Sequence, residues 1–144
     1  MERVKIKLPE NFNFSTNIKI RITDLNYGGH VGNDSFLSLI HEARQQFFNF
    51  FGYSESKIEE ASLIMTDALI EFKKELNYGD EVKISVVANG FDKFGFDLFY
   101  KLEIINTGTP VLAGKAKTGM MCYNYDNKKL MHLPGKVIAV LSNV

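Results

Sequence analysis

The sequence contains very little cysteine and no stretch typical of a targeting or membrane segment. Cys122 is the only cysteine, so no disulfide can form within the chain, and a zinc site built on paired cysteines is excluded. A chain without disulfides suits a reducing compartment, and we expect a cytoplasmic protein. The first seven residues alternate charged and apolar side chains, and no run approaches the roughly 20 apolar residues of a membrane helix. We expect no association with membranes.

A surplus of charge of either sign is also missing. Lysine plus arginine and aspartate plus glutamate both number 17, so the basic surplus of a nucleic-acid-binding protein is absent, and we expect no nucleic-acid partner. Hydrophobic residues make up 45% and charged residues 24%, as in ordinary globular domains. The length of 144 residues and the absence of a linker or repeat predict a single domain over residues 1–144.

Two hydrophobic periods follow one another in the first third of the chain. Residues 12–22 place apolar side chains at most even positions, which predicts a strand with one buried face. Over Asn33–Phe51 the apolar side chains recur every three or four residues, which predicts a long helix that other structure covers on most sides. Asn33 or Asp34 can cap its first amides, and Gly52 is placed to end it in a left-handed conformation.

Four further runs alternate with a period of two, and a short helix is expected near the end. The runs are Ile64 to Phe72, Val82 to Ala88, Phe94 to Ile104 and Leu112 to Cys122. Turn residues separate these runs, so we expect consecutive runs to be antiparallel neighbours in one sheet. The closing helix is expected at Gly135–Leu141. This order predicts an α+β fold in which an antiparallel sheet wraps around one long central helix, with Cys122 in the core.

The segment between the first strand and the long helix carries the candidate chemistry. A helix N-terminus offers unpaired amides and the positive end of the helix dipole, which suit a developing oxyanion. Asp24 continues the parity of the buried strand positions, so its carboxylate is expected on the core side if the strand extends that far. Asn26 and His30 follow in the same loop. Aspartate and asparagine before two glycines are also common turn formers, so a purely structural loop is the alternative interpretation.

This segment resembles a known family. Residues 23–33 together with His41-Glu42-Ala43-Arg44 resemble the Asp-x-Asp-x-x-Gly-His-Val-x-Asn segment and the Glu-x-Ala-Arg helix of hydroxybenzoyl-CoA thioesterase-like proteins. Residues 63–80 resemble the same family. The resemblance implies a hotdog fold, sheets paired edge to edge in a homodimer or a dimer of dimers, and acyl-CoA or acyl-carrier protein as substrate at the subunit interface. It implies no cofactor beyond the CoA of the substrate.

One position departs from the family pattern. The second acidic residue of the motif, where many family members place their catalytic aspartate, is Asn26, and an amide cannot accept a proton from water at neutral pH. Three interpretations are open: Asp24 or His30 is the base while Asn26 orients water, or His41 or Glu42 is the base, or the protein binds thioesters without cleaving them. We favour the first, with Asp24, Asn26 and His30 as the catalytic set.

A second group of residues is expected to bind substrate. The resemblance implies that amides near Asn33 and Asp34 polarise the thioester carbonyl. The expected substrate-binding residues are Gly29, Val31, Asn33, Asp34, His41, Glu42 and Thr66, and no metal ligands are expected. A solvated or interface role is the alternative for His41 and Glu42, which lie on the polar stripe of the helix. Asp67, next to Thr66, is expected to face solvent.

The main functional hypothesis is hydrolysis of an acyl-CoA or acyl-carrier thioester by activated water. A hydratase is a second possibility, because Asp24, Asn26 and His30 also resemble the Asp-x-Asn-Pro-x-His motif of hotdog enoyl-CoA hydratases. In this chain Tyr27 replaces the proline, and His30 is one residue too late. A non-catalytic acyl-thioester binding protein is the third.

Overall fold

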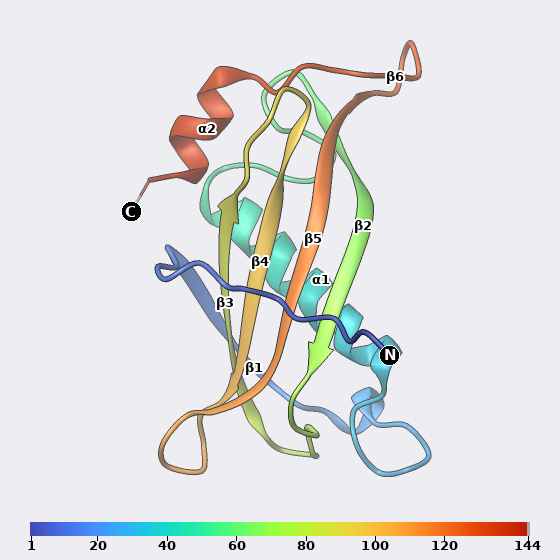
Figure 1. Ribbon diagram of the computed structural model, residues 1–144, viewed down its shortest axis with the longest axis vertical. Coiled ribbons are helices and arrows are strands. Elements are labelled where there is room, and N and C mark those ends of the chain that lie inside the picture. The colour runs from blue at the N-terminus through green and yellow to red at the C-terminus, as the bar shows by residue number, and fades with distance from the viewer. Residues whose placement is uncertain (144) are drawn as a thin grey trace.

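A single antiparallel sheet forms one layer of the protein, and one long helix forms the other (Figure 1). The computed structural model describes residues 1–143. The order of the main strands in the sheet is β1-β3-β4-β5-β2, and β6 pairs with β5. The strands are β1 (Phe14–Lys19), β2 (Ser62–Phe72), β3 (Glu81–Asn89), β4 (Gly95–Ile104), β5 (Val111–Asn124) and β6 (Lys129–Leu130). The predicted α+β architecture is confirmed.

Helix α1 (Asn33–Phe50) lies behind the sheet in Figure 1, and its apolar face makes the core. Ile40, Ala43, Phe47 and Phe48 are fully buried against the strands. Burying one such phenylalanine contributes roughly 1.5–3 kcal/mol to folding, so the phenylalanines of this helix are a large part of the stability. The predicted central helix is therefore confirmed.

The two ends of α1 differ in how well they were predicted. The residue at the N-cap position is Gly32, so neither Asn33 nor Asp34 occupies the cap itself. The Asn33 side chain instead accepts a hydrogen bond from the amide of Asp34, 3.0 Å away. At the other end Gly52 has a φ of 82°, as expected of a residue that ends a helix.

The connection between β2 and β3 differs from the expectation. These consecutive strands are not neighbours, because β2 pairs only with β5 while β3 lies between β1 and β4. The turn at residues 77–80 does form, but its backbone bonds to the segment before α1: Gly79 donates to the carbonyl of Ile20, and Ile20 donates to that of Asp80. The turn residues predicted a reversal of the chain correctly, yet they carry no information about which strand lies beside it.

Strand β2 forms one edge of the sheet and contains a bulge. Met65 pairs with Met120 and Asp67 with Gly119, so Thr66 is an extra residue. The expected single buried face from Ile64 to Phe72 is therefore wrong. Before the bulge, Leu63 lies on the side of the strand that faces the helix. After the bulge, Ala68, Ile70 and Phe72 lie on that side.

Two terminal segments cover the remaining surfaces of the sheet. The N-terminal residues cross the face opposite α1 (Figure 1), where the amide of Ile6 donates to the carboxylate of Glu71. Helix α2 (Gly135–Leu141) forms as predicted and buries Val137 and Leu141. Neither helix of residues 1–143 has both the length and the apolar character needed to cross a membrane.

Candidate functional site

The loop before α1 is a tight, internally bonded structure. The amide of Asn26 donates to the carbonyl of His30 at 2.9 Å, and Leu25 bridges to Val31. On its other side the loop runs antiparallel to the segment that follows β2, because His30 bridges to Asn77. The amide of Val31 donates to the carbonyl of Leu76, also at 2.9 Å. This loop, residues 25–32, is called the site loop below. Backbone hydrogen bonds hold it both to itself and to the segment that follows β2.

Asp24 is buried, but it does not lie in a strand. Strand β1 ends at Lys19, and Asp24 closes a 3₁₀ turn that runs over Ile22–Asp24. Its carboxylate accepts a hydrogen bond from the backbone amide of Arg21 at 2.8 Å and pairs with the Arg21 guanidinium at 3.2 Å. The strand does not extend to this residue, so the condition for the expected parity is not met, although the side chain is buried and both carboxylate oxygens are engaged locally.

Asn26 and His30 approach each other across Gly28. The Asn26 side-chain oxygen accepts a hydrogen bond from the amide of Gly28 at 2.8 Å. A Cβ placed on Gly28 would lie 3.2 Å from that oxygen and 3.3 Å from Nε2 of His30. The predicted pair is therefore brought together, whereas the Asp24 carboxylate is paired with Arg21.

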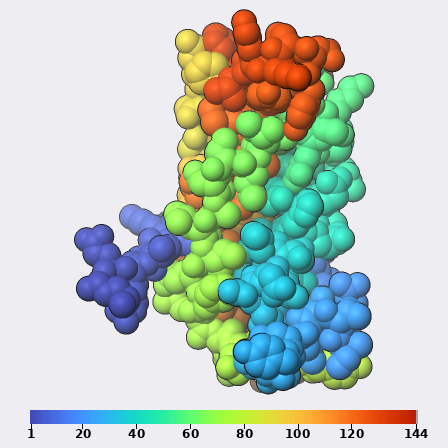
Figure 2. All heavy atoms as spheres, turned by 90° about the vertical axis from the view of Figure 1, so that its right-hand side faces the viewer, coloured from blue at the N-terminus to red at the C-terminus, as the bar shows by residue number. Residues whose placement is uncertain are grey.

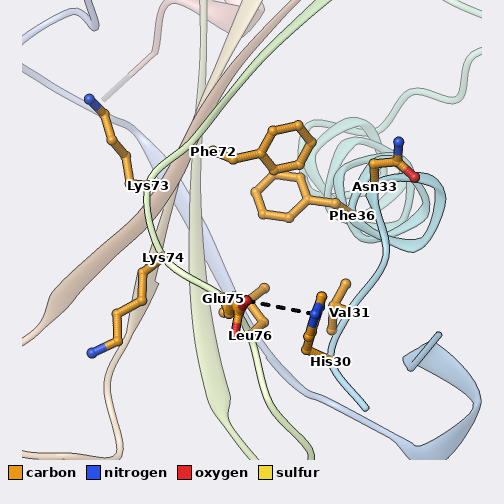
Figure 3. Close-up of a pocket in the computed structure, with 9 residues that line it drawn as sticks. All are labelled: His30, Val31, Asn33, Phe36, Phe72, Lys73, Lys74, Glu75 and Leu76. Carbon is orange, nitrogen blue, oxygen red and sulfur yellow. Dashed lines mark ion pairs between the residues drawn. The ribbon is translucent and has the colours of Figure 1, made fainter. Parts of the chain in front are cut away.

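A pocket of about 330 Å³ opens beside His30, a volume within the range of small-molecule sites (Figure 3). Its walls come from the site loop, from the first turn of α1 and from the end of β2 with the residues that follow. The lining residues are His30, Val31, Asn33, Phe36, Phe72, Lys73, Lys74, Glu75 and Leu76. Of the predicted site residues, His30, Val31 and Asn33 lie here. A shallower hollow next to it is lined by Asn33, Asp34, Ala68, Ile70 and Phe72.

The start of α1 provides a free backbone donor to the pocket. Within residues 1–143 no acceptor contacts the amide of Asn33, whereas the amide of Asp34 is bonded to the Asn33 side chain. The first amides of a helix also carry the positive end of its dipole. An oxygen placed against this amide would be stabilised as it gained negative charge.

The opposite wall of the pocket is aromatic. The rings of Phe36 and Phe72 meet edge to face with centroids 5.0 Å apart, and Phe72 remains 56% exposed. Phe36 can lie close to β5 because residue 114 is glycine: a Cβ there would come within 2.5 Å of the Phe36 ring. The pocket thus joins a polar end to an apolar surface that suits a flat ring.

His30 faces one carboxylate across the pocket mouth. Its Nε2 lies 3.7 Å from Oε1 of Glu75, with the two side chains 35% and 70% exposed. Figure 3 shows this pair below the two rings. Sequence reasoning missed Phe72 and Glu75 as site residues. The pattern marked Phe72 only as a strand residue, and nothing near Glu75 in the sequence links it to a histidine 45 positions away.

The two predicted residues farther along α1, His41 and Glu42, lie outside this pocket. His41 is 3.9 Å from a carboxylate oxygen of Glu55, whose other oxygen pairs with the buried guanidinium of Arg44. Arg44 in turn donates to the hydroxyl of Tyr100, so His41 borders a structural network under the helix. Glu42 accepts a hydrogen bond from the side chain of Gln46.

Thr66 belongs to the bulge of β2, where its hydroxyl donates to the carbonyl of Gly119 at 3.2 Å. Asp67 beside it is exposed, as predicted, and its hydrogen bond to Lys117 lowers the pKa of the carboxyl group. Gly29, also predicted, has a φ of 83° on the outer turn of the loop. Among residues 1–143 no cluster of three or more histidine, cysteine or acidic side chains could hold a metal ion.

Cys122 packs in the core, as predicted. Its side chain is fully buried, and burial raises the pKa of the thiol to about 11. The thiol is therefore protonated at neutral pH, and a protonated thiol is not a nucleophile.

Comparisons with known proteins agree with this architecture. The chain is 28% identical over 118 residues to a 1,4-dihydroxy-2-naphthoyl-CoA hydrolase from Microcystis aeruginosa, which covers 80% of this chain and 83% of that protein. A 1,4-dihydroxy-2-naphthoyl-CoA thioesterase from Synechocystis superposes with a TM-score of 0.80 at 19% identity, covering 91% of this chain and 96% of that one. A variant of 4-hydroxybenzoyl-CoA thioesterase in complex with 4-hydroxybenzoyl-CoA gives 0.80 at 15% identity, covering 90% and 98%.

These structures share the hotdog fold with this protein, which confirms the predicted fold class. A sequence profile of the thioesterase-like superfamily matches residues 20–141, from the end of the first strand to the end of α2. The matched region contains the site loop, α1 and the whole pocket. The chain therefore belongs to the thioesterase-like superfamily, as its sequence resemblance indicated.

Proposed function

We propose that this protein is a thioesterase that hydrolyses an acyl-CoA with an activated water molecule. The observation that carries the proposal is the pocket itself, where the imidazole of His30, the free amide of Asn33 and an aromatic wall surround one space. Membership of the thioesterase-like superfamily and the naming of its relatives as CoA hydrolases support the same reaction.

The chemistry needs one base and one oxyanion donor. The water oxygen attacks the thioester carbonyl carbon while the His30 imidazole accepts the water proton. The carbonyl oxygen becomes negative and is stabilised by the amide of Asn33, an interaction typically worth roughly 10²–10³ in rate. The carbonyl then re-forms as the carbon–sulfur bond breaks, and the imidazolium returns the proton to the CoA thiolate. The products are a carboxylic acid and free CoA.

His30 fits the role of base better than the other two members of the predicted catalytic set. Arg21 holds the Asp24 carboxylate away from the pocket lining. The Asn26 side-chain oxygen accepts a hydrogen bond from the amide of Gly28. Asn26 can therefore orient a water molecule beside the imidazole, but it cannot act as the base. We therefore assign proton transfer to His30 and the positioning of water to Asn26.

The acyl group is proposed to be aromatic. Phe36 and Phe72 present an edge-to-face pair to the pocket, a surface on which a flat ring can stack. The relatives that resemble this chain are named for a naphthoyl-CoA and a hydroxybenzoyl-CoA. We expect an aryl-CoA to be hydrolysed with a higher kcat/KM than a straight-chain acyl-CoA.

We propose further that two copies pair through β2. In Figure 2 this strand, in green, lies open to solvent beside the first half of α1. Met65 and Leu69 on it are 44% and 42% exposed, and a strand with a free edge and apolar side chains favours pairing with a second chain. Such pairing would place the end of β2, and therefore the pocket, next to the partner.

The test is a measurement of thiol release from a panel of acyl-CoA substrates. Benzoyl-CoA and 1,4-dihydroxy-2-naphthoyl-CoA represent aryl substrates, octanoyl-CoA a straight chain, and crotonoyl-CoA the hydratase alternative. Because Cys122 is fully buried, its thiol adds no background to a thiol reagent. We expect thiol release from the aryl substrates and a decrease of about tenfold or more in turnover for His30→Ala. Loss of enoyl absorbance without thiol release would indicate a hydratase.

A non-catalytic binding protein is the remaining candidate, and Asn26 is the observation that favours it. A protein of that kind would be thermally stabilised by an acyl-CoA without releasing thiol. Asn26→Asp restores the acid of the family motif. If the wild type binds but does not cleave, and Asn26→Asp cleaves, the chain is a binding protein that has lost its acid.

A further inference from the structure

Residue 26 is an asparagine where the family motif has an acidic residue, but the pocket contains another carboxylate. Asp24 is paired with Arg21, and the carboxylate of Asp34 is directed to the backbone at Gly32, where a Cβ would lie 2.7 Å from its oxygen. Glu75 is the acidic residue that lines the pocket, and its Oε1 lies 3.7 Å from Nε2 of His30.

The backbone fixes the side of the chain on which Glu75 lies. His30 bridges to Asn77, and the amide of Val31 donates to Leu76 in the same antiparallel ladder. Side chains alternate along such a ladder, and Leu76 is directed into the core with 1% exposure. Glu75 is therefore on the opposite side from Leu76, the side that carries His30. A diagonal cross-strand pair of this kind is within reach of long side chains.

Glu75 is not neutralised by the lysines that precede it. Lys73 pairs with Glu71 at 2.5 Å, and Figure 3 shows the ammonium groups of Lys73 and Lys74 directed away from His30. Among residues 1–143, His30 is the one basic side chain within ion-pair distance of Glu75. The carboxylate is thus available to the imidazole.

We infer that Glu75 is a positioning residue that orients the His30 imidazole during thioester hydrolysis, in place of the acid missing at Asn26. This inference rests on the proposed function. If the 3.7 Å separation closes by a few tenths of an ångström, the carboxylate can accept a hydrogen bond from the Nε2–H group of His30, which leaves Nδ1 unprotonated to take the proton of the attacking water. The imidazolium formed in that step is stabilised by the negative charge of Glu75 until it returns its proton to the CoA thiolate.

The pair is exposed enough to be tested without unfolding the protein. Ion pairs between solvent-exposed groups contribute little to stability, so Glu75→Gln is expected to leave the unfolding midpoint nearly unchanged. Its effect should appear in kcat. We expect a decrease of about tenfold or more in kcat for Glu75→Gln with KM changed by less than about twofold. Glu75→Asp keeps the carboxylate and should recover part of the loss.

A double-mutant cycle measures whether Glu75 acts through His30. If it does, His30→Ala with Glu75→Gln loses no more activity than His30→Ala alone, because the carboxylate has nothing left to position. Glu60→Gln is the matched control: this exposed glutamate precedes the far end of β2, and its substitution should leave kcat unchanged.

Each outcome of these measurements decides a different question. Additive losses in the double variant, or wild-type kcat for Glu75→Gln, overturn the role of Glu75 while thiol release by the wild type keeps the proposed function. A wild-type protein that releases no thiol from any acyl-CoA overturns the proposed function, and the inference with it. Equal losses in Glu75→Gln and Glu60→Gln would show a general effect of charge and also overturn it.

Discussion

Gly28 keeps open the space between Asn26 and His30. A methyl group there would lie 3.2 Å from the Asn26 oxygen and 3.3 Å from Nε2 of His30, so one of the two must move. The residue has no left-handed φ, and alanine is compatible with its backbone. We predict that Gly28→Ala lowers kcat by about tenfold or more at nearly unchanged stability, because small displacements of a catalytic group are costly. Steady-state kinetics and urea unfolding measure the two effects.

Gly108 provides the opposite control for that prediction. It lies between β4 and β5 with a φ of 99°, and nothing surrounds the position of its missing Cβ. Gly108→Ala should cost roughly 1–2 kcal/mol of stability through backbone strain while kcat stays the same. If Gly28→Ala behaves like Gly108→Ala, the crowding of the imidazole has no catalytic effect.

At the scale of residues, the sequence predicted the site in part. His30, Val31 and Asn33 were identified because they are close in the chain to the start of a recognisable helix. Whether the first strand reaches Asp24 was left open, since the local turn that ends it is not visible in hydrophobic alternation. Glu75 was missed because its link to His30 depends on a ladder between distant segments.

The bulge is the feature of β2 that determines what each half of the strand contacts. Thr66 and Asp67 both lie over Gly119, whose missing Cβ would be 2.9 Å from each of their side-chain oxygens. The amide of Gly119 also donates to Asp67 at 3.0 Å, and Lys117 pairs with Asp67 at 2.8 Å. These contacts hold the extra residue in place.

We predict that Gly119→Ala destabilises the protein by roughly 1–3 kcal/mol, because a methyl group overpacks the bulge. Gly135→Ala is its control, since residue 135 begins α2 with open space around it and should change stability by less than about 0.5 kcal/mol. Urea unfolding of both variants gives the comparison. Equal stabilities would mean that the bulge adjusts to the added methyl group at no cost.

At the scale of elements, periodicity predicted the helix and the strands, because burial of one face leaves a direct trace in the sequence. The pairing of neighbouring strands was predicted correctly where a short turn joins them, as between β3 and β4 and between β4 and β5. The predicted pairing of β2 with β3 is wrong, since the turn between these strands bonds to the segment before α1. The bulge was not foreseen, because one inserted residue resembles ordinary variation in the pattern.

For the whole molecule, the free edge of β2 leads to a prediction about mass in solution. We expect the wild type to elute with about twice the chain mass of 16.4 kDa. Replacing Met65 and Leu69 together by lysine should shift the protein towards the monomer, because charged side chains oppose pairing of edge strands. Light scattering after size-exclusion chromatography measures this.

Ile138→Lys is the matched control for the dimer prediction. Ile138 is also a partly exposed apolar residue, but it lies on α2. Its substitution should leave the mass unchanged. A wild type that elutes as a monomer at all concentrations contradicts the proposed pairing, and a dimer that survives both lysines in β2 moves the interface elsewhere.

The extra residue in β2 also bears on how such a protein can diversify. Upstream of Thr66 the side chain of Leu63 is buried in the core, and downstream Ala68, Ile70 and Phe72 line a hollow beside the pocket. The two halves of one strand therefore serve different parts of the molecule, one the core and the other the ligand site. Substitutions in the second half can adapt the pocket to acyl groups of new shape while the folding information of the first half is inherited intact.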